Sequence, residues 1–202
     1  MIKMIEYAKE NNIPIMEKEG LDFLLEYIKK NNIKSILEIG SAIGYSAINM
    51  ALINENIRVV TVERDVLRYD EAIKNINKFN LNKQIEIYNI DAFDFSIEEE
   101  FDLIFIDAAK AQYTKFFEKF KINLNNNGVI ITDNLSFHGL TDKDAVIESR
   151  NVRQLVRKIN DYVLFLKENK EFSTIFYNVG DGVAVSKKKV GECMGSGNED
   201  IF

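Results

Sequence analysis

The chain has 202 residues, of which 46% are hydrophobic and 29% are charged, and its formal net charge is −6. These values are typical of one soluble globular domain, and the negative charge argues against a basic surface for indiscriminate nucleic-acid binding. The longest apolar run, 162–166, is too short to span a membrane, and the single cysteine, Cys193, allows no intramolecular disulfide. We therefore expect a cytoplasmic protein without a signal peptide.

Helical and strand patterns alternate along the chain. Between residues 21 and 28, apolar side chains recur at i, i+3, i+4 and i+7, which predicts a helix with one buried face. Similar stripes predict helices over 69–76, with Asp65 as the N-cap, and over 113–120. The second stripe is aromatic, and we assign it to packing against a sheet rather than to binding. Short apolar runs predict strands at 35–39, 58–62, 85–88, 103–106 and 129–132.

The C-terminal part has a different pattern. Two β-rich runs, 172–178 and 182–186, are joined by Val179-Gly180-Asp181, which predicts a hairpin. Apolar strands separated by helices predict an α/β fold with a mostly parallel sheet, helices on both faces and this antiparallel hairpin at the end. We expect one domain over residues 1–189, followed by a disordered Gly/Ser-rich tail, 190–202.

A glycine-containing turn follows the first predicted strand. Gly40 and Gly44 stand between that strand and a helix, and Glu63 ends the next strand about 20 residues later. In open α/β sheets this position is the usual nucleotide-cofactor site, and the acid can accept hydrogen bonds from ribose hydroxyls. The alternative is a turn that serves only close packing between strand and helix.

Three oxygen donors follow the fourth and fifth predicted strands: Asp107, Asp133 and Asn134. The carboxyl ends of parallel strands share one edge of a sheet, so these side chains are expected beside the glycine turn. Hard oxygen ligands suit Mg²⁺ or another hard divalent cation, which would lower the pKa of a bound hydroxyl. Lys110 could accept that proton. The alternative is that both aspartates cap the helices after their strands.

Six motifs, in order, carry a family resemblance: ILEIGSAIGYS, VVTVERD, NIDAF, FIDAAKAQY, VIITDN and NVGDGVAVSKK. They resemble the metal-dependent class I S-adenosylmethionine O-methyltransferases of the catechol and caffeoyl-CoA type. Residues 7–10 and 13–20 most resemble the branch that converts 5-hydroxyuridine at the tRNA wobble position into 5-methoxyuridine. The resemblance implies a Rossmann-like fold, S-adenosylmethionine as cofactor, and a homodimer.

The resemblance also implies roles for individual residues. Asp107, Asp133 and Asn134 match the metal ligands, and Lys110 with Asp107 matches the catalytic pair. Glu63 would bind the ribose, Asp91 the adenine amino group, and a free hydroxyl of Ser46 the methionine carboxylate. The full set of implied cofactor contacts is Met16, Glu38, Gly40, Ser46, Glu63, Asp91, Ala92 and Asp107.

A basic helix face bears on the choice of substrate. Arg150, Arg153 and Arg157 recur at i, i+3 and i+7, and the stretch 148–158 carries a local charge of +3. Such a face could bind phosphates of a tRNA anticodon loop, with Phe137 or Tyr113 stacking on a splayed base. The alternative for these two aromatic residues is that they belong to the core. The alternative is an ordinary solvated face. His138, the only histidine, we interpret as a loop residue rather than a base.

These observations favour methylation of the 5-hydroxyl of a tRNA wobble uridine, with no membrane association. Two alternatives stay open. One is the same chemistry on a small catechol or caffeoyl-CoA-like molecule. The other is a non-catalytic RNA- or nucleotide-binding module, against which the joint presence of Asp107, Lys110, Asp133 and Asn134 argues.

Overall fold

The computed structural model describes residues 1–135 and 149–189. Phe137, His138, Cys193 and the predicted tail 190–202 lie outside the described residues. The strands are β1 (Ser35–Ile39), β2 (Arg58–Glu63), β3 (Ile85–Asn89), β4 (Phe101–Ile106), β5 (Leu124–Thr132), β6 (Phe172–Tyr177) and β7 (Val183–Lys188). The α-helices are α1 (Ile2–Glu10), α2 (Lys18–Lys30), α3 (Tyr45–Ala51), α4 (Val66–Lys78), α5 (Tyr113–Phe120) and α6 (Arg150–Glu168), and two 3-10 turns are η1 (Lys110–Gln112) and η2 (Lys121–Asn123).

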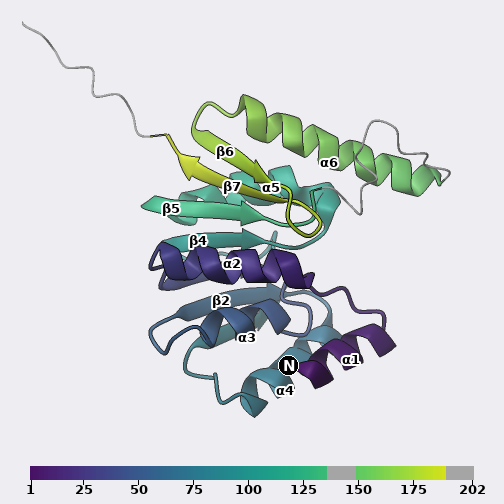
Figure 1. The fold of residues 1–202 in the computed structure, drawn as a ribbon, viewed down its shortest axis with the longest axis vertical. Coiled ribbons are helices and arrows are strands. Elements are labelled where there is room, and N and C mark those ends of the chain that lie inside the picture. The colour runs from purple at the N-terminus through teal and green to yellow at the C-terminus, as the bar shows by residue number, and fades with distance from the viewer. Residues whose placement is uncertain (136–148, 190–202) are drawn as a thin grey trace, which may run out of the picture.

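One seven-stranded sheet, in the order β3-β2-β1-β4-β5-β7-β6, forms the centre of the fold (Figure 1). Strands β1 to β5 pair in parallel, and β7 pairs antiparallel with both β5 and β6. The predicted fold class is therefore confirmed, including the terminal hairpin. From β1 the chain proceeds outward to β2 and β3 and then returns to β4 on the other side of β1. That reversal leaves a crevice at the carboxyl ends of β1 and β4.

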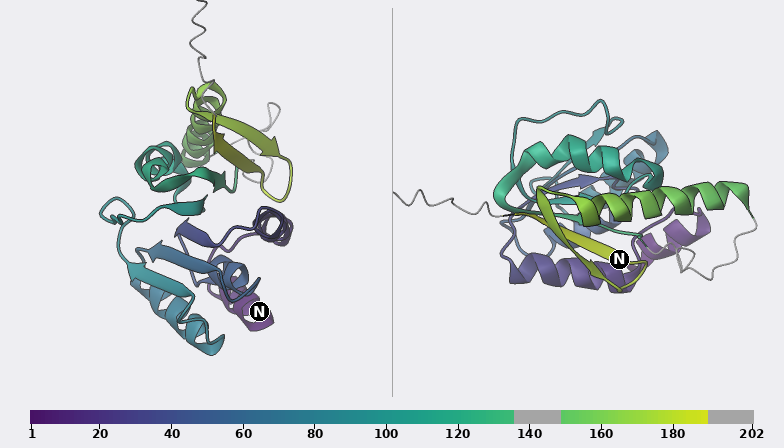
Figure 2. Two further views of the ribbon diagram at one scale, coloured as in Figure 1. Left: turned by 90° about the vertical axis from the view of Figure 1, so that its left-hand side faces the viewer. Right: turned by 90° about the horizontal axis from the view of Figure 1, so that it is seen from above.

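Both faces of the sheet are buried, which explains why the strands are apolar without alternation. Ile36 of β1 belongs to a core shared with α1, α2, α3 and α4, whereas Leu37 and Ile39 belong to a second core shared with α5 and α6. Helices α2 and α5 accordingly lie on opposite sides of the sheet (Figure 2). The aromatic stripe of α5 is buried in the second core, as predicted, with Phe117 fully inaccessible.

Local signals placed most element boundaries to within a few residues. Asp65 caps α4 as predicted, since its carboxylate accepts a hydrogen bond from the Arg68 amide at 3.0 Å. Helix α1 was not predicted, because only Met4 and Ala8 of its nine residues are buried and the surrounding sequence shows no clear stripe. Within the described residues, no helix has both the length and the apolar character that crossing a membrane would need.

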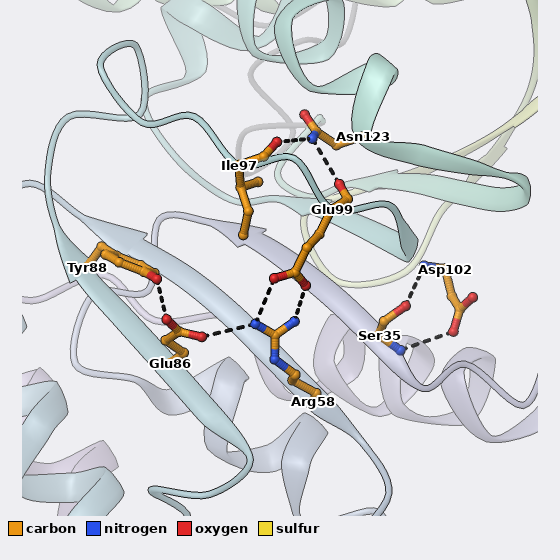
Figure 3. Close-up of polar contacts among 8 residues, drawn as sticks. All are labelled: Ser35, Arg58, Glu86, Tyr88, Ile97, Glu99, Asp102 and Asn123. Carbon is orange, nitrogen blue, oxygen red and sulfur yellow. Dashed lines mark hydrogen bonds and ion pairs between the residues drawn. The ribbon is translucent and has the colours of Figure 1, made fainter.

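The amino ends of the strands are tied together by polar contacts (Figure 3). Arg58 at the start of β2 binds Glu99 and also Glu86 of β3, the latter at 3.0 Å. Asp102 of β4 accepts hydrogen bonds from the Lys34 and Ser35 amides at 2.8 and 3.0 Å. These contacts hold the segment before β4 across one edge of the sheet, and the crevice lies at the opposite edge.

Candidate active site

A pocket of about 800 Å³ occupies the carboxyl edge of the sheet. This volume is in the range of clefts that bind small molecules or cofactors. Its walls come from the turn after β1, the ends of β2 and β4, the segment before α2, and the β6–β7 turn. Seven of the predicted cofactor contacts line the pocket: Met16, Gly40, Ser46, Glu63, Asp91, Ala92 and Asp107.

The turn after β1 requires glycine. Gly40 has a φ of +96°, and a Cβ there would lie 2.3 Å from the Asp107 carbonyl oxygen. The amides of Gly40 and Ser41 donate to the Val62 carbonyl oxygen at 3.1 and 3.3 Å, so the turn is held against β2. Among the buried side-chain atoms of the described residues, Ser41 Oγ lacks a hydrogen-bond partner and lies in the pocket wall. A buried hydroxyl in that position is suited to a bound ligand.

Two carboxylates lie where the adenosine part of a cofactor is expected. Glu63 is 7% exposed, and its two oxygens accept hydrogen bonds from the Ala42 and Asp65 amides, each at 2.9 Å. These bonds fix the carboxylate at the pocket wall and leave lone pairs for ribose hydroxyls. Asp91 accepts from the Phe93 amide at 2.9 Å and lies 3.6 Å from the Arg64 guanidinium. The cofactor roles of both residues stay predictions.

Glu38 is fully buried in β1 and does not line the pocket. It accepts hydrogen bonds from the hydroxyls of Ser46 and Thr61, the latter at 2.6 Å. Burial raises the pKa of this carboxyl to about 7. Two predictions are therefore wrong. Glu38 cannot contact a cofactor directly, and the Ser46 hydroxyl is not free, because it already donates its proton to Glu38.

The predicted metal ligands and the predicted base do come together. The Asn134 side-chain amide donates to Asp107 and to Asp133, each at 3.0 Å, and Lys110 Nζ donates to Asn134 Oδ1 at 3.1 Å. Asn134 adopts a φ of +66°, a left-handed conformation that asparagine tolerates and that turns it back over the strand ends. Asp107 does not cap the following elements, since Ala109 precedes η1 and Gln112 precedes α5.

Burial and like charge dominate the electrostatics of this cluster. Burial raises the pKa of Asp107 to about 6, and burial together with the charge of Asp107 raises the pKa of Asp133 to about 8. Burial lowers the pKa of Lys110. The negative charges of Asp181, Asp107 and Asp133 act in the opposite direction and raise it, but by less. A cation between the two carboxylates would stabilise their charged forms and so counteract both burial and like charge.

The donor set fits a hard divalent cation but supplies only part of a coordination shell. Two carboxylates and one amide would leave the other positions to water or acceptor oxygens, as Mg²⁺ commonly allows. Within residues 1–135 and 149–189, no three Asp, Glu, His or Cys side chains are grouped to hold a metal. Metal binding by Asp107, Asp133 and Asn134 therefore stays a prediction.

The residues predicted for a tRNA substrate lie outside the pocket. Arg150, Arg153 and Arg157 are exposed on α6, opposite the buried Val156 and Ile159. Helix α6 packs against η1, the turn that carries Lys110.

Tyr113 is a core residue, which confirms the packing alternative and excludes stacking on a base. This side chain is 1% exposed, and its hydroxyl donates to the Asp133 carbonyl oxygen at 3.1 Å.

Sequence reasoning missed Glu17 and Asp181, which also line the pocket. Asp181 was interpreted only as part of a hairpin turn, yet it is 6% exposed. A single acid between two glycines in a tight turn is the only local signal, and it does not distinguish a surface turn from a buried one.

Comparisons with known proteins agree with the fold. An O-methyltransferase family profile matches residues 2–189. A catechol O-methyltransferase from Niastella koreensis is 33% identical over 166 residues, which cover 76% of this chain and 72% of that protein.

Two solved structures are also similar. A Staphylococcus aureus protein provisionally named a caffeoyl-CoA O-methyltransferase is 40% identical, with a TM-score of 0.87 and coverage of 92% of this chain and 90% of that one. An O-methyltransferase from Bacillus cereus in complex with SAH (S-adenosylhomocysteine) is 27% identical, with a TM-score of 0.78 and coverage of 93% and 89%.

Proposed function

The chain belongs to the O-methyltransferase family and is an S-adenosylmethionine-dependent O-methyltransferase, and we propose that it methylates an aromatic hydroxyl with the help of a divalent cation. The observation that carries this proposal is the joining of Asp107, Asp133 and Asn134 by two 3.0 Å hydrogen bonds. Asp107 and Asn134 line the pocket, and Asp133 lies buried next to them. Two buried carboxylates with raised pKa values are a suitable environment for a cation.

Six polar residues in or beside the pocket would have distinct tasks. Glu63 would hold the ribose hydroxyls, and the Ser41 hydroxyl would bind a polar group of the cofactor. Asp107, Asp133 and Asn134 would hold the cation. When bound, the cofactor supplies an activated methyl group and the cation lowers the pKa of the acceptor hydroxyl. Lys110, whose pKa is lowered by burial, would accept the hydroxyl proton at Nζ.

A small catechol or caffeoyl-CoA-like acceptor is the substrate class that we favour. The catechol enzyme from Niastella koreensis covers most of the chain at 33% identity, and the pocket of about 800 Å³ has room for a small acceptor beside the cofactor. Its walls include Pro14, Met16 and Phe116, which are apolar surfaces on which an aromatic ring can pack.

The second candidate is 5-hydroxyuridine in the tRNA anticodon loop. It is favoured by the exposed arginines of α6, a helix that packs against the turn carrying Lys110. Three aligned guanidinium groups can bind successive phosphates of an RNA strand. A homodimer and a cytoplasmic location stay predictions from the resemblance and the composition.

One experiment tests the proposal and separates the two substrates. The purified protein is incubated with S-adenosylmethionine and Mg²⁺, and with either a catechol or tRNA that contains 5-hydroxyuridine. Methylated catechol or 5-methoxyuridine is then measured by mass spectrometry. Product that forms only without chelator supports the cation-dependent reaction, and no product from either acceptor contradicts it.

Charge reversal then identifies the role of α6. If tRNA is the substrate, the triple variant Arg150→Glu, Arg153→Glu and Arg157→Glu should lose tRNA methylation and keep catechol methylation. A control variant reverses two charges elsewhere, at the exposed Lys78 and Lys83 outside the pocket, and should change neither activity. Equal tRNA methylation by both variants would exclude the basic face as an RNA-binding surface.

A further inference from the structure

The pocket wall contains a second buried polar atom without a partner. Among the side-chain nitrogen and oxygen atoms that are buried in the described parts of the chain, only Ser41 Oγ and Gln112 Oε1 make no hydrogen bond. Both residues line the pocket. The Ser41 hydroxyl has a role in the proposed function, whereas Gln112 has none. Because a buried amide oxygen is costly to leave without a donor, its position indicates a donor on a bound ligand.

Helix α5 connects Gln112 to the adenosine end of the pocket. Gln112 directly precedes α5, and its backbone amide donates to the Ala109 carbonyl oxygen at 2.8 Å. Phe116, four residues later and therefore on the same side of the helix, also lines the pocket. Its ring stacks on that of Phe93, with centroids 4.8 Å apart and planes at 26°. Phe93 comes two residues after Asp91, which is predicted to bind the adenine amino group.

The stacked ring of Phe93 is held by α5 and still offers an aromatic surface. Lys119 Nζ donates to the Phe93 carbonyl oxygen at 2.5 Å, and Lys115 Nζ lies 5.9 Å from the centroid of the Phe93 ring. Phe93 is 41% exposed and lines the pocket. A flat ligand in this part of the pocket can therefore pack on an aromatic side chain.

Adenine is the part of the cofactor that matches these surroundings. Its exocyclic amino group donates hydrogen bonds, and the ring nitrogens beside that group accept them. A carboxamide carries an acceptor and a donor in one plane, and glutamine pairs in this way with adenine in protein–DNA complexes. The amino group has two hydrogens, so Gln112 and Asp91 can each accept one. Asp91 is partly exposed and lies 3.6 Å from the Arg64 guanidinium, so the buried Gln112 oxygen is the more dependent on this donor.

We propose that Gln112 selects adenine in the cofactor by accepting a hydrogen bond from the exocyclic amino group at Oε1. This inference rests on one part of the proposed function, which is that S-adenosylmethionine binds in this pocket. It depends on neither the cation nor the acceptor. A base without the amino group would leave Oε1 buried and unpaired, and it should therefore bind less tightly.

Calorimetry with two ligands tests this role. One is S-adenosylhomocysteine, and the other is its analogue with unsubstituted purine, which lacks the exocyclic amino group. The wild type should bind S-adenosylhomocysteine at least about 10-fold more tightly than the analogue. Gln112→Met should lose about 10-fold in affinity for S-adenosylhomocysteine and bind the analogue as the wild type does. Gln112→Glu should keep the preference, because a carboxylate oxygen still accepts from the amino group.

The control variant is Gln154→Met, an exposed substitution on α6 outside the pocket, which should keep both affinities. Equal binding of the two ligands by the wild type would overturn the proposal, and this comparison needs no variant to fold. Equal weakening of both ligands in Gln112→Met would also overturn it, because it would indicate a structural role at the start of α5.

The same measurements separate this inference from the proposed function. If the folded wild type binds neither ligand, both the placement of the cofactor and the role of Gln112 are wrong. If Gln112→Met loses the preference but no acceptor is methylated by the wild type, the role of Gln112 is supported and only the proposed reaction is refuted.

Discussion

Replacing Glu38 by glutamine should affect stability in a pH-dependent way. The free energy of unfolding of the variant minus that of the wild type should be larger at alkaline pH than at acidic pH. The carboxyl is fully buried, and burial raises its pKa from the ordinary 4.5 to about 7. Below pH 4.5 the group is neutral in both the folded and the unfolded chain and imposes no penalty. As the pH rises toward 7 the unfolded chain ionises first, so stability is lost, and the loss is complete above that pH.

The size of the effect follows from the two pKa values. The difference between about 7 and 4.5 corresponds to about 3 kcal/mol in total. Most of this loss, about 2 to 3 kcal/mol, falls between pH 5 and pH 8. Glutamine does not ionise, so the variant does not undergo this pH-dependent loss of stability. The variant also loses one of the two oxygens that accept hydrogen bonds from the Ser46 and Thr61 hydroxyls. The resulting loss of stability does not depend on pH.

Urea unfolding of both proteins at pH 5 and pH 8 measures the effect. The free energy of unfolding of Glu38→Gln minus that of the wild type should rise by about 2 to 3 kcal/mol between the two pH values. Asp107 and Asp133 also titrate in this window, but they do so in both proteins, so most of their contribution cancels in the difference. The charge of Asp107 contributes to the raised pKa of Glu38 and is part of the measured effect. Glu55→Gln, an exposed control, should give no such rise. A pH-independent difference for Glu38→Gln would refute the assignment of a buried, largely neutral carboxyl.

Three further substitutions test the site. Asp133→Ala removes one of the two carboxylates of the predicted cation site, so methyl transfer should fall by at least about 100-fold and calorimetric Mg²⁺ binding should weaken; turnover that persists in chelator would contradict cation dependence. Lys110→Met should lower kcat by about 10²- to 10⁴-fold with cofactor affinity unchanged, and a parallel loss of affinity would instead indicate a structural role. Gly40→Ala forces a Cβ to 2.3 Å from the Asp107 carbonyl oxygen and should lower the free energy of unfolding by about 2–4 kcal/mol in denaturant titrations; unchanged stability would show that the turn can relax.

The sequence by itself determined the elements and the edge of the sheet where the site lies. Apolar runs, helical stripes and turn residues are local signals, and they predicted all seven strands and the Asp65 cap. Because parallel strands direct their carboxyl ends to one edge, the positions of Gly40, Glu63 and Asp107 along the chain were enough to predict that they share a pocket.

Only the tertiary structure decided which polar atoms meet. The Ser46 hydroxyl binds Glu38, the Tyr113 hydroxyl binds the Asp133 carbonyl, and Asp181 lines the same pocket as Lys110 from a hairpin about 70 residues later. Periodicity reports which face a side chain occupies, but a hydrogen bond depends on distances of a few tenths of an ångström between segments far apart in the chain. Those distances result from the packing of the two helical layers on the sheet, which no local pattern contains.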